Sequence, residues 1–218
     1  MKIFVVIPAF NEGRIIAETI ANVKNYYSDI IVVDDGSTDD TFDRAKPAGA
    51  KVLRHIINRG QGAALRTGIN YALENGAEII VTFDADGQFE AGEIEKMCQP
   101  IINGDCEVVL GTRFAGGNRI PLKKSLLLKA ATILTEIITG MELTDVHNGF
   151  RALSRQAALN IIIRQDRMAH ASDIIHEIAR LKLKFKEIPV TVKYTDYSKT
   201  KGQKISGSLK ILFDMIFK

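Results

Sequence analysis

The sequence predicts an α/β fold with a mostly parallel sheet that is covered by helices on both faces. In the first 110 residues, short apolar runs alternate with segments of helical periodicity, which is the pattern of repeated strand and helix units. The runs are continuous in isoleucine and valine, as is typical of strands buried on both faces. The five runs are KIFVVI, DIIVVD, KVLRHI, EIIVTF and CEVVLG.

The segments between these runs have the spacing of helices with one apolar face. After the first run, Ile16, Ile20 and Val23 fall on one stripe. After the third run, Ala64, Gly68 and Tyr71 form a similar stripe, and its small residues permit close packing. This order of elements predicts a Rossmann-like arrangement.

The second half of the chain predicts fewer strands. Residues 115–140 suggest a glycine-rich loop followed by a helix, and further helices are expected over residues 154–163 and 172–181. The segment KFKEIPVTVKY predicts a late strand. Residues 205–218 predict an amphipathic C-terminal helix that packs on the core, on another subunit or on a bilayer surface.

The composition is that of a folded protein. Of 218 residues, 46% are hydrophobic and 25% are charged, which allows a sizeable core and excludes a disordered chain. Cys98 and Cys106 are too few for a disulfide framework and lack the spacing of metal ligands. The N-terminus lacks the apolar region of a signal peptide, and no apolar run reaches the roughly 18 residues of a membrane span. We therefore expect a soluble or peripheral protein in the cytoplasm.

Charge is distributed unevenly along the chain. Residues 182–218 carry nine lysines and three acidic residues, a net charge of +6; because the whole chain carries +3, the remainder carries −3. A basic segment is commonly a solvated face, and it is also suited to anionic lipid or pyrophosphate. We expect no nucleic-acid partner, and homo-oligomerisation stays open.

Polar residues follow three of the predicted strands, where ligands of parallel sheets bind. These segments are residues 8–12 (PAFNE), 34–37 (DDGS) and 84–88 (DADGQ). Taken singly, Asn11 or Ser37 could simply cap a helix. Together, the carboxylates would repel one another unless a cation or ordered hydrogen bonds compensate.

Asp84 and Asp86 predict a divalent metal site. They lie two residues apart directly after EIIVTF, so both carboxylates can point into one cleft, and Gln88 can add a carbonyl oxygen. Hard oxygen ligands suit Mg²⁺ or Mn²⁺. Such an ion keeps positions open for phosphate oxygens and neutralises a departing diphosphate.

Six segments, in this order and spacing, resemble family 2 glycosyltransferases of the GT-A fold: VIPAFNE, VVDDGSTDDT, NRGQGAALRTG, FDADGQ, GTRF and NGFRALSR. The resemblance is closest to the dolichol-phosphate mannosyltransferase and polyprenyl-phosphate glycosyltransferase branch. It implies one GT-A domain over residues 1–204, followed by the helix at 205–218. It also implies an inverting, metal-dependent transfer of sugar from a GDP- or UDP-sugar to a polyprenyl or dolichyl phosphate.

The resemblance also implies roles for single residues. Asp86 and Arg113 would lie at the catalytic centre, and Arg113 would face a phosphate. Lys124 and Arg151 would contact the acceptor phosphate, although this branch has an arginine at the position of Lys124 and a serine at that of Leu128. The nucleotide-sugar site would comprise Pro8, Ala9, Asn11, Glu12, Asp35, Asn58, Arg59, Gly60, Asp84 and Ala85.

The acceptor decides whether a general base is needed. A lipid phosphate is already anionic, whereas the hydroxyl of a saccharide must lose a proton. Asp145 and Asp173 are candidates for such a base. Asp145 could instead order its loop, and Asp173 could instead interact with a helix dipole. His147 and His170 flank the same predicted mouth and are given no catalytic role.

Other classes of protein agree less well with the sequence. A sugar nucleotidyltransferase would have a glycine-rich arginine loop where this chain has PAFNEGR, and a receiver domain is contradicted by the length and by DADGQ. A non-catalytic nucleotide-binding scaffold is a distant alternative. Because most lipid-phosphate relatives add membrane helices and this chain stops at Lys218, we expect peripheral attachment to the cytoplasmic face of a membrane or docking on a membrane protein.

Overall fold

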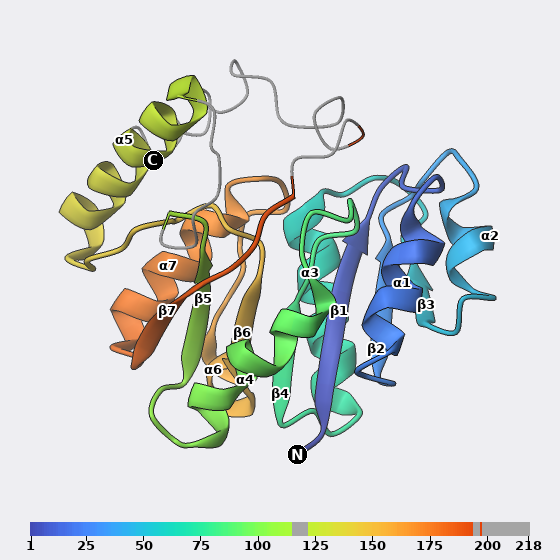
Figure 1. Ribbon diagram of the computed structural model, residues 1–218, viewed down its shortest axis with the longest axis horizontal. Helices are drawn as coiled ribbons and strands as arrows, with labels where there is room; N and C mark the ends of the chain where they lie inside the picture. Colours follow the sequence, from blue (N-terminus) through green and yellow to red (C-terminus); the bar gives the residue numbers. More distant parts are fainter. Residues whose placement is uncertain (115–121, 194–196, 198–218) are drawn as a thin grey trace.

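The computed structural model describes residues 1–114, 122–193 and 197, which build one sheet with helices on both faces (Figure 1). The strands are β1 (Ile3–Ala9), β2 (Ile30–Asp34), β3 (Lys51–Arg54), β4 (Ile79–Thr82), β5 (Val108–Thr112), β6 (Arg151–Ser154) and β7 (Phe185–Pro189). Their order in the sheet is β3-β2-β1-β4-β6-β5-β7. The pairs of β6 with β4 and β5 are antiparallel, and the other pairs are parallel, so the predicted mostly parallel sheet is confirmed.

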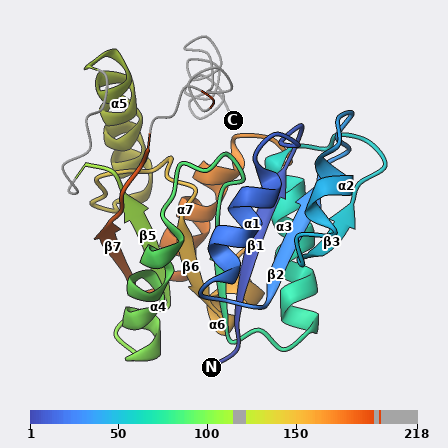
Figure 2. The ribbon, with the colours of Figure 1, turned by 45° about the vertical axis from the view of Figure 1, so that its right-hand side comes forward.

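Helices cover both faces of the sheet, also as predicted (Figures 1 and 2). One face carries α1 (Ile16–Lys24), α2 (Thr41–Ala45), the 3-10 turn η1 (Ala91–Glu93) and α4 (Ile94–Ile102). The other face carries α3 (Gln61–Glu74), α6 (Arg155–Asn160) and α7 (His170–Leu181). Helix α5 (Leu122–Thr139) contacts α7 beyond the β5 and β7 side of the sheet.

Each strand contributes to two hydrophobic cores because successive side chains point to opposite faces. Val5 and Ile7 of β1 pack with Ile20 of α1 in one core. Val6 packs with Ala64 of α3 in the other core. This double burial explains why the strands are continuous in isoleucine and valine rather than alternating with polar residues.

Gly68 sets the close approach of α3 to the sheet. A Cβ atom at this position would overlap the side chain of Val6 and lie 3.2 Å from that of Val33. The prediction that small residues on this stripe permit close packing is therefore confirmed.

The second half of the chain differs from the prediction at β6. Residues 151–154 lack a strand signature, yet they pair with β4 and β5 in the middle of the sheet, and Val81 lies opposite Ala152. The helix expected over residues 154–163 is the shorter α6, whose N-cap Ser154 accepts a hydrogen bond from the backbone N–H of Ala157 (3.1 Å). The predicted helix at 205–218 lies outside the described residues. In the described part of the chain, no helix is both long and apolar enough to cross a membrane.

Candidate active site

The predicted site residues meet at the edge of the sheet where the parallel strands end. Strands β1, β2 and β4 lead into the segments after Ala9, Asp34 and Thr82. Because β6 runs in the opposite direction, its first residue, Arg151, lies at this same edge, paired with Thr82. Asp84 follows Thr82 by two residues, so an acidic and a basic group are brought together from distant parts of the sequence.

Asp84 lies in a half-buried position with several charged groups close to it. The side-chain amide of Gln61 donates to its Oδ1 atom (3.0 Å). Burial, and then the negative charge of Asp86, raise the pKa of Asp84 to about 7, whereas the positive charges of Arg151 and Arg113 act in the opposite direction. The effect of Asp86 on the pKa of Asp84 indicates that the two carboxylates lie close together.

Gly149 closes one side of Asp84. A Cβ atom at position 149 would overlap Oδ2 of Asp84 and lie 2.7 Å from Oδ1. The carbonyl oxygen of Gly149 accepts a hydrogen bond from the Thr82 hydroxyl (2.6 Å). The glycine of the NGFR segment is therefore required because the backbone passes directly over the carboxylate.

The carboxylates of Asp84 and Asp86 fit a hard divalent cation such as Mg²⁺ or Mn²⁺. Within residues 1–114, 122–193 and 197, no three His, Cys, Asp or Glu side chains are grouped so that they could hold a metal ion. Two carboxylates suffice for a cation that takes its remaining ligands from substrate phosphates and water. Across the same described ranges, no hydrogen-bond donor reaches Oδ2 of Asp84, which leaves this atom for a ligand.

Gln88 does not have the predicted orientation of a metal ligand. Its backbone N–H and its side-chain amide donate to the two carboxylate oxygens of Asp86, at 3.1 and 2.5 Å. The amide thus presents its nitrogen to Asp86 rather than its carbonyl oxygen to a cation. In this arrangement Gln88 orients Asp86.

Arg113 and Asp145 form a buried ion pair, with side-chain exposures of 9% and 0%. The backbone N–H and Nε of Arg113 both donate to Oδ2 of Asp145, at 3.1 and 2.6 Å, and its Nη2 donates to the carbonyl oxygen of His147 (3.0 Å). The structure thus supports the alternative in which Asp145 orders its loop. A direct catalytic role for Asp145 stays a prediction.

Arg151 is a second buried cation of the site. It is 2% exposed, and burial lowers its pKa to about 10, an effect that Asp84 and Asp145 oppose. Its Nη2 donates to the carbonyl oxygen of Val146 (3.3 Å), whereas its buried Nη1 has no hydrogen-bond partner among the residues that the structure describes. A buried donor without a partner is rare in folded proteins and is suited to an anionic ligand.

Two histidines lie beside these charged groups. Burial lowers the pKa of His147 to about 4, with Asp145 opposing, and that of His170 to about 3, with Arg151 adding to the effect. Nδ1 of His170 lies 3.0 Å from the carbonyl oxygen of Arg167. Both rings are neutral at neutral pH and are weak bases, which agrees with giving them no catalytic role.

Asp173 lies in the first turn of α7 and orders the preceding loop. Its Oδ2 atom accepts hydrogen bonds from the backbone N–H groups of Arg164 (2.9 Å) and Gln165 (2.6 Å). The structure gives it this positioning role, and a direct catalytic role stays a prediction.

The first of the predicted nucleotide-binding turns, at Asn11, is held by side-chain hydrogen bonds between two loops. Asn11 has a φ of 55°, its backbone N–H donates to the Ser37 hydroxyl (2.9 Å), and its Oδ1 accepts from the backbone N–H of Thr38 (2.9 Å). The expectation that Asn11 could cap a helix is wrong, because its side chain joins two loops instead. Next to it, Glu12 accepts a hydrogen bond from the hydroxyl of Tyr197 (2.6 Å).

Asp35 orders the loop at residues 58–60, which is part of the predicted nucleotide-sugar site. It is 2% exposed and accepts the backbone N–H groups of Arg59 (3.0 Å) and Gly60 (2.6 Å), while Nδ1 of His55 lies 2.6 Å from Oδ1. The loop that holds Asn58 is thereby fixed. Contact of Asp35 with a base or ribose stays a prediction.

Other carboxylates at this edge of the sheet have partners that offset their negative charge. Asp34 accepts the backbone N–H of Ser37 and pairs with Arg54 (3.1 Å), and Asp39 accepts the backbone N–H of Gly13 (3.0 Å). The repulsion that predicted a cation is therefore concentrated at the two carboxylates after β4.

The remaining predicted residues are placed as follows. Pro8 and Ala9 end β1, and the Ala9 carbonyl oxygen accepts the backbone N–H of Asp35 (2.8 Å). Ala85 is buried, and its carbonyl oxygen accepts the hydroxyl of Thr19 (3.0 Å). Lys124 belongs to α5, but its side chain lies outside the described set, so its acceptor role stays a prediction.

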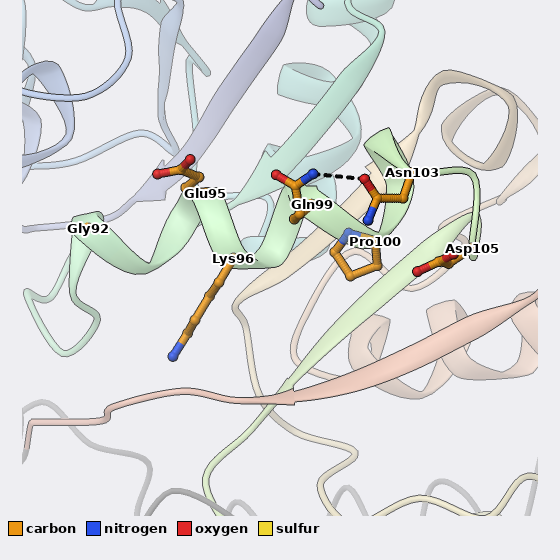
Figure 3. A pocket seen from close by; sticks show the side chains of 7 residues that line it. All are labelled: Gly92, Glu95, Lys96, Gln99, Pro100, Asn103 and Asp105. Atoms are coloured by element: carbon orange, nitrogen blue, oxygen red, sulfur yellow. Dashed lines mark hydrogen bonds between the residues drawn. The ribbon is translucent and has the colours of Figure 1, made fainter.

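A pocket of about 400 Å³ lies away from these residues, along α4 (Figure 3). None of the predicted site residues lines it. Its lining consists of Gly92, Glu95, Lys96, Gln99, Pro100, Asn103 and Asp105.

With the site assembled, similarity to known proteins identifies the family. The family model "Glycosyl transferase family 2" matches residues 4–161. The chain belongs to glycosyl transferase family 2. It is therefore a glycosyltransferase, as the sequence motifs predicted.

Similar proteins occur in archaea and in bacteria. An uncharacterised protein of Methanocaldococcus jannaschii is 41% identical over 99% of this chain and 91% of its own length. The UDP-N-acetylglucosamine–dolichyl-phosphate N-acetylglucosaminyltransferase of Methanococcus voltae is 34% identical over 98% of this chain and 94% of its own length. A bacterial relative, the undecaprenyl-phosphate mannosyltransferase of Micrococcus luteus, is 28% identical over 88% of this chain and 83% of its own length.

The fold is also shared with solved glycosyltransferase structures. Glucosyl-3-phosphoglycerate synthase of Mycobacterium tuberculosis, solved in complex with Mn²⁺ and UDP-glucose, matches with a TM-score of 0.75 and 20% identity. The match covers 99% of this chain and 76% of the other. The predicted GT-A fold is confirmed.

Two contributors to the site were not predicted. Gln61 lies in the NRGQG segment, but only the neighbouring Asn58, Arg59 and Gly60 were assigned a role. Gly149 lies in the NGFR segment, where only Arg151 was assigned a role. Both belong to motifs that the sequence shows, but their contacts with Asp84 are tertiary contacts between distant segments, which the sequence does not show.

Proposed function

We propose that this glycosyltransferase transfers a sugar, with inversion, from a UDP- or GDP-sugar to a polyprenyl or dolichyl phosphate, and that the transfer depends on Mg²⁺ or Mn²⁺. The observation that carries the proposal is the buried Arg151, whose Nη1 has no partner in the described part of the chain, beside the acidic pair of Asp84 and Asp86. A site that combines a cation-binding pair with a buried guanidinium suits two phosphate groups, one on the donor and one on the acceptor.

The state of the carboxylates favours a phosphate acceptor over a hydroxyl acceptor. The two candidate bases, Asp145 and Asp173, are both engaged in ordering loops. The two nearby histidines are neutral and too weakly basic to remove a proton from a hydroxyl efficiently. A phosphate oxygen is already anionic and needs attraction and orientation rather than deprotonation.

The donor would lie across the carboxyl edge of β1, β2 and β4. The loop at Asn58–Gly60, fixed by Asp35, and the turn at Asn11 would bound the nucleoside. Asp84 and Asp86 would hold the cation, which when bound neutralises the charge on the departing diphosphate. The named relatives support this proposal, because two of them act on dolichyl or undecaprenyl phosphate and a solved structure of the same fold contains Mn²⁺ with UDP-glucose.

Arg151 would attract and orient the attacking phosphate oxygen from the opposite side of the site. Its guanidinium is held in place by the Val146 carbonyl oxygen and by the charges of Asp84 and Asp145. The preformed arrangement would reduce the cost of orienting the two reacting groups.

The proposal is tested by incubating the protein with a panel of UDP- and GDP-sugars, a polyprenyl phosphate and Mn²⁺. Labelled lipid and released nucleoside diphosphate are measured. We expect both products with at least one donor, and their loss when the cation is chelated. Asp86→Asn should lower the rate by roughly a hundredfold or more, because it removes a charge from the cation site.

A parallel reaction with a saccharide acceptor separates the proposal from its alternative. Sugar transfer to a hydroxyl, with no transfer to lipid phosphate, would contradict the acceptor assignment. Full activity of Asp86→Asn in the presence of chelator would contradict the cation assignment.

A further inference from the structure

Gln61 is the first residue of α3 and reaches across the site to a proposed cation ligand. Its amide nitrogen lies 3.0 Å from Oδ1 of Asp84, 23 residues further along the chain. Across the described ranges this is the one hydrogen bond that the Asp84 side chain accepts. Because of this contact, Oδ1 of Asp84 accepts a hydrogen bond, whereas Oδ2 stays available for a ligand.

The backbone that carries Gln61 is fixed from two sides. On one side, Asp35 accepts the backbone N–H of Gly60, the N-cap of α3 (2.6 Å). On the other side, the carbonyl oxygen of Asp166 accepts the backbone N–H of Ala63 (3.0 Å). Gly60 has a φ of 109°, and a Cβ atom there would lie 2.8 Å from Cγ of Arg167, so this crowded junction requires glycine.

An uncharged amide suits this position on electrostatic grounds. The Gln61 amide donates a hydrogen bond to Oδ1 of Asp84 and so fixes this carboxylate without adding a charge that would compete with the cation. A lysine here would pair with Asp84 and oppose the cation, and an apolar side chain would leave Oδ1 without its donor.

We propose that Gln61 is a positioning residue that orients Asp84 for the cation and couples the nucleoside end of the site to the cation end. The inference rests on the proposed cation-dependent transfer. The connection runs from Asp35 through the backbone of Gly60 to Gln61, and from its amide to Asp84. Nucleoside contact that tightens the loop at Gly60 would thereby strengthen cation binding, and by linkage the reverse also holds.

The test measures Mn²⁺ binding directly, by electron paramagnetic resonance of the free ion, with and without UDP or GDP. Gln61→Leu keeps the approximate volume and removes the donor, so we expect roughly tenfold weaker Mn²⁺ binding. Gln61→Lys should weaken binding further, because it adds a competing charge. In both variants the nucleotide should strengthen Mn²⁺ binding by a smaller factor than in the parent protein.

Gln99→Leu is the matched control. Gln99 also carries an amide that bonds a side chain, Oδ1 of Asn103 (2.8 Å), but on the outer surface of α4 (Figure 3). We expect its Mn²⁺ affinity and nucleotide coupling to equal those of the parent. Circular dichroism melting of each variant ensures that folded proteins are compared.

Two outcomes are distinguishable. If the parent protein binds no Mn²⁺, the cation part of the proposed function fails, and the inference about Gln61 fails with it. If the parent binds Mn²⁺ and folded Gln61→Leu and Gln61→Lys bind it equally well, only the positioning role is overturned. Equal weakening by leucine and lysine would also overturn it, because a purely structural role predicts no dependence on charge.

Discussion

At the scale of single residues, Gly149 and Asp84 show how tightly the site is built. The absence of a side chain at position 149 allows the backbone to cover the Asp84 carboxylate, and the Thr82 hydroxyl holds that backbone through the Gly149 carbonyl oxygen. The glycine is therefore a determinant of carboxylate position, although it has no functional group of its own.

Gly149→Ala should disturb the proposed cation site. The added methyl group would overlap Oδ2 of Asp84 and displace the carboxylate, so we expect weaker Mn²⁺ binding and at least tenfold slower transfer, together with a stability loss of about 1–3 kcal/mol. Gly92→Ala is the control, because the atoms nearest to its Cβ would belong to the Tyr26 side chain, with the hydroxyl at 3.2 Å, and not to a carboxylate of the site. Unchanged Mn²⁺ affinity in Gly149→Ala would contradict this prediction.

The ion pair of Arg113 and Asp145 gives a second prediction at this scale. Asp145→Asn leaves the Arg113 guanidinium buried without its counter-charge, and we expect the free energy of unfolding to fall by about 3–5 kcal/mol in urea denaturation. The double variant Arg113→Met, Asp145→Leu removes both charges and should recover much of this loss. A double variant no more stable than Asp145→Asn would show that charge burial is not the cause.

At the scale of elements, α7 is joined to the preceding loop by a buried carboxylate. Glu177 accepts hydrogen bonds from Arg180 (2.8 and 3.0 Å), one turn further on, and from Arg164 (2.9 Å) in the loop. These bonds, together with the backbone N–H of Ile162, lower the pKa of Glu177 to about 2 against the opposing effect of burial. The helix thus holds the loop that packs against the first turn of α3.

The lowered pKa makes this junction sensitive to acid. Because the folded pKa lies below the ordinary value near 4.5, the stabilisation is complete above pH 4.5 and is lost as the pH falls toward 2. Glu177→Gln should lower Tm at pH 7 and flatten the fall in Tm between pH 5 and pH 2. The exposed Glu74→Gln, at the end of α3, serves as the control. Parallel pH profiles for Glu177→Gln and the parent would refute the assignment.

At the scale of the whole molecule, the order of the strands explains why the site residues lie together at one edge of the sheet. Strand β6 enters between β4 and β5 from the opposite direction, so Arg151 reaches the edge where Asp84 emerges. The first residue of α3, Gln61, also lies at this edge, where its amide donates a hydrogen bond to Asp84, and α1 and α3 lie on opposite faces of the sheet (Figure 2). The site is a product of topology, since residues as far apart in the 218-residue sequence as Pro8 and Arg151 lie at this one edge.

The uneven charge of the chain gives a prediction about membranes. Residues 182–218 carry nine lysines against three acidic residues, and a lipid-phosphate acceptor would be presented at a bilayer surface. We expect the protein to sediment with phosphatidylglycerol vesicles, less strongly at high salt. Deleting residues 205–218 should reduce the bound fraction, and neutral phosphatidylcholine vesicles provide the control. Equal binding of the truncated and full chains would remove the proposed membrane role of this segment.

The strands of the first half could be predicted from the sequence because their physical causes are local. Buried parallel strands require continuous apolar runs, and a ligand edge requires polar residues directly after them. The same reasoning missed β6, because four residues such as RALS carry no strand pattern of their own. Their conformation is fixed by hydrogen bonds from both neighbouring strands, which only the assembled sheet supplies.

By itself, the sequence determined the α/β class, the family and the acidic pair at Asp84 and Asp86. The tertiary structure decided which acids accept hydrogen bonds, that Asp145 pairs with Arg113, that Nη1 of the buried Arg151 has no partner within the described residues, and that Gln61 donates a hydrogen bond to Asp84. The physical reason is that periodicity and motifs record the local preferences of the chain, whereas burial and charge pairing depend on which distant segments the fold brings within a few ångströms of one another.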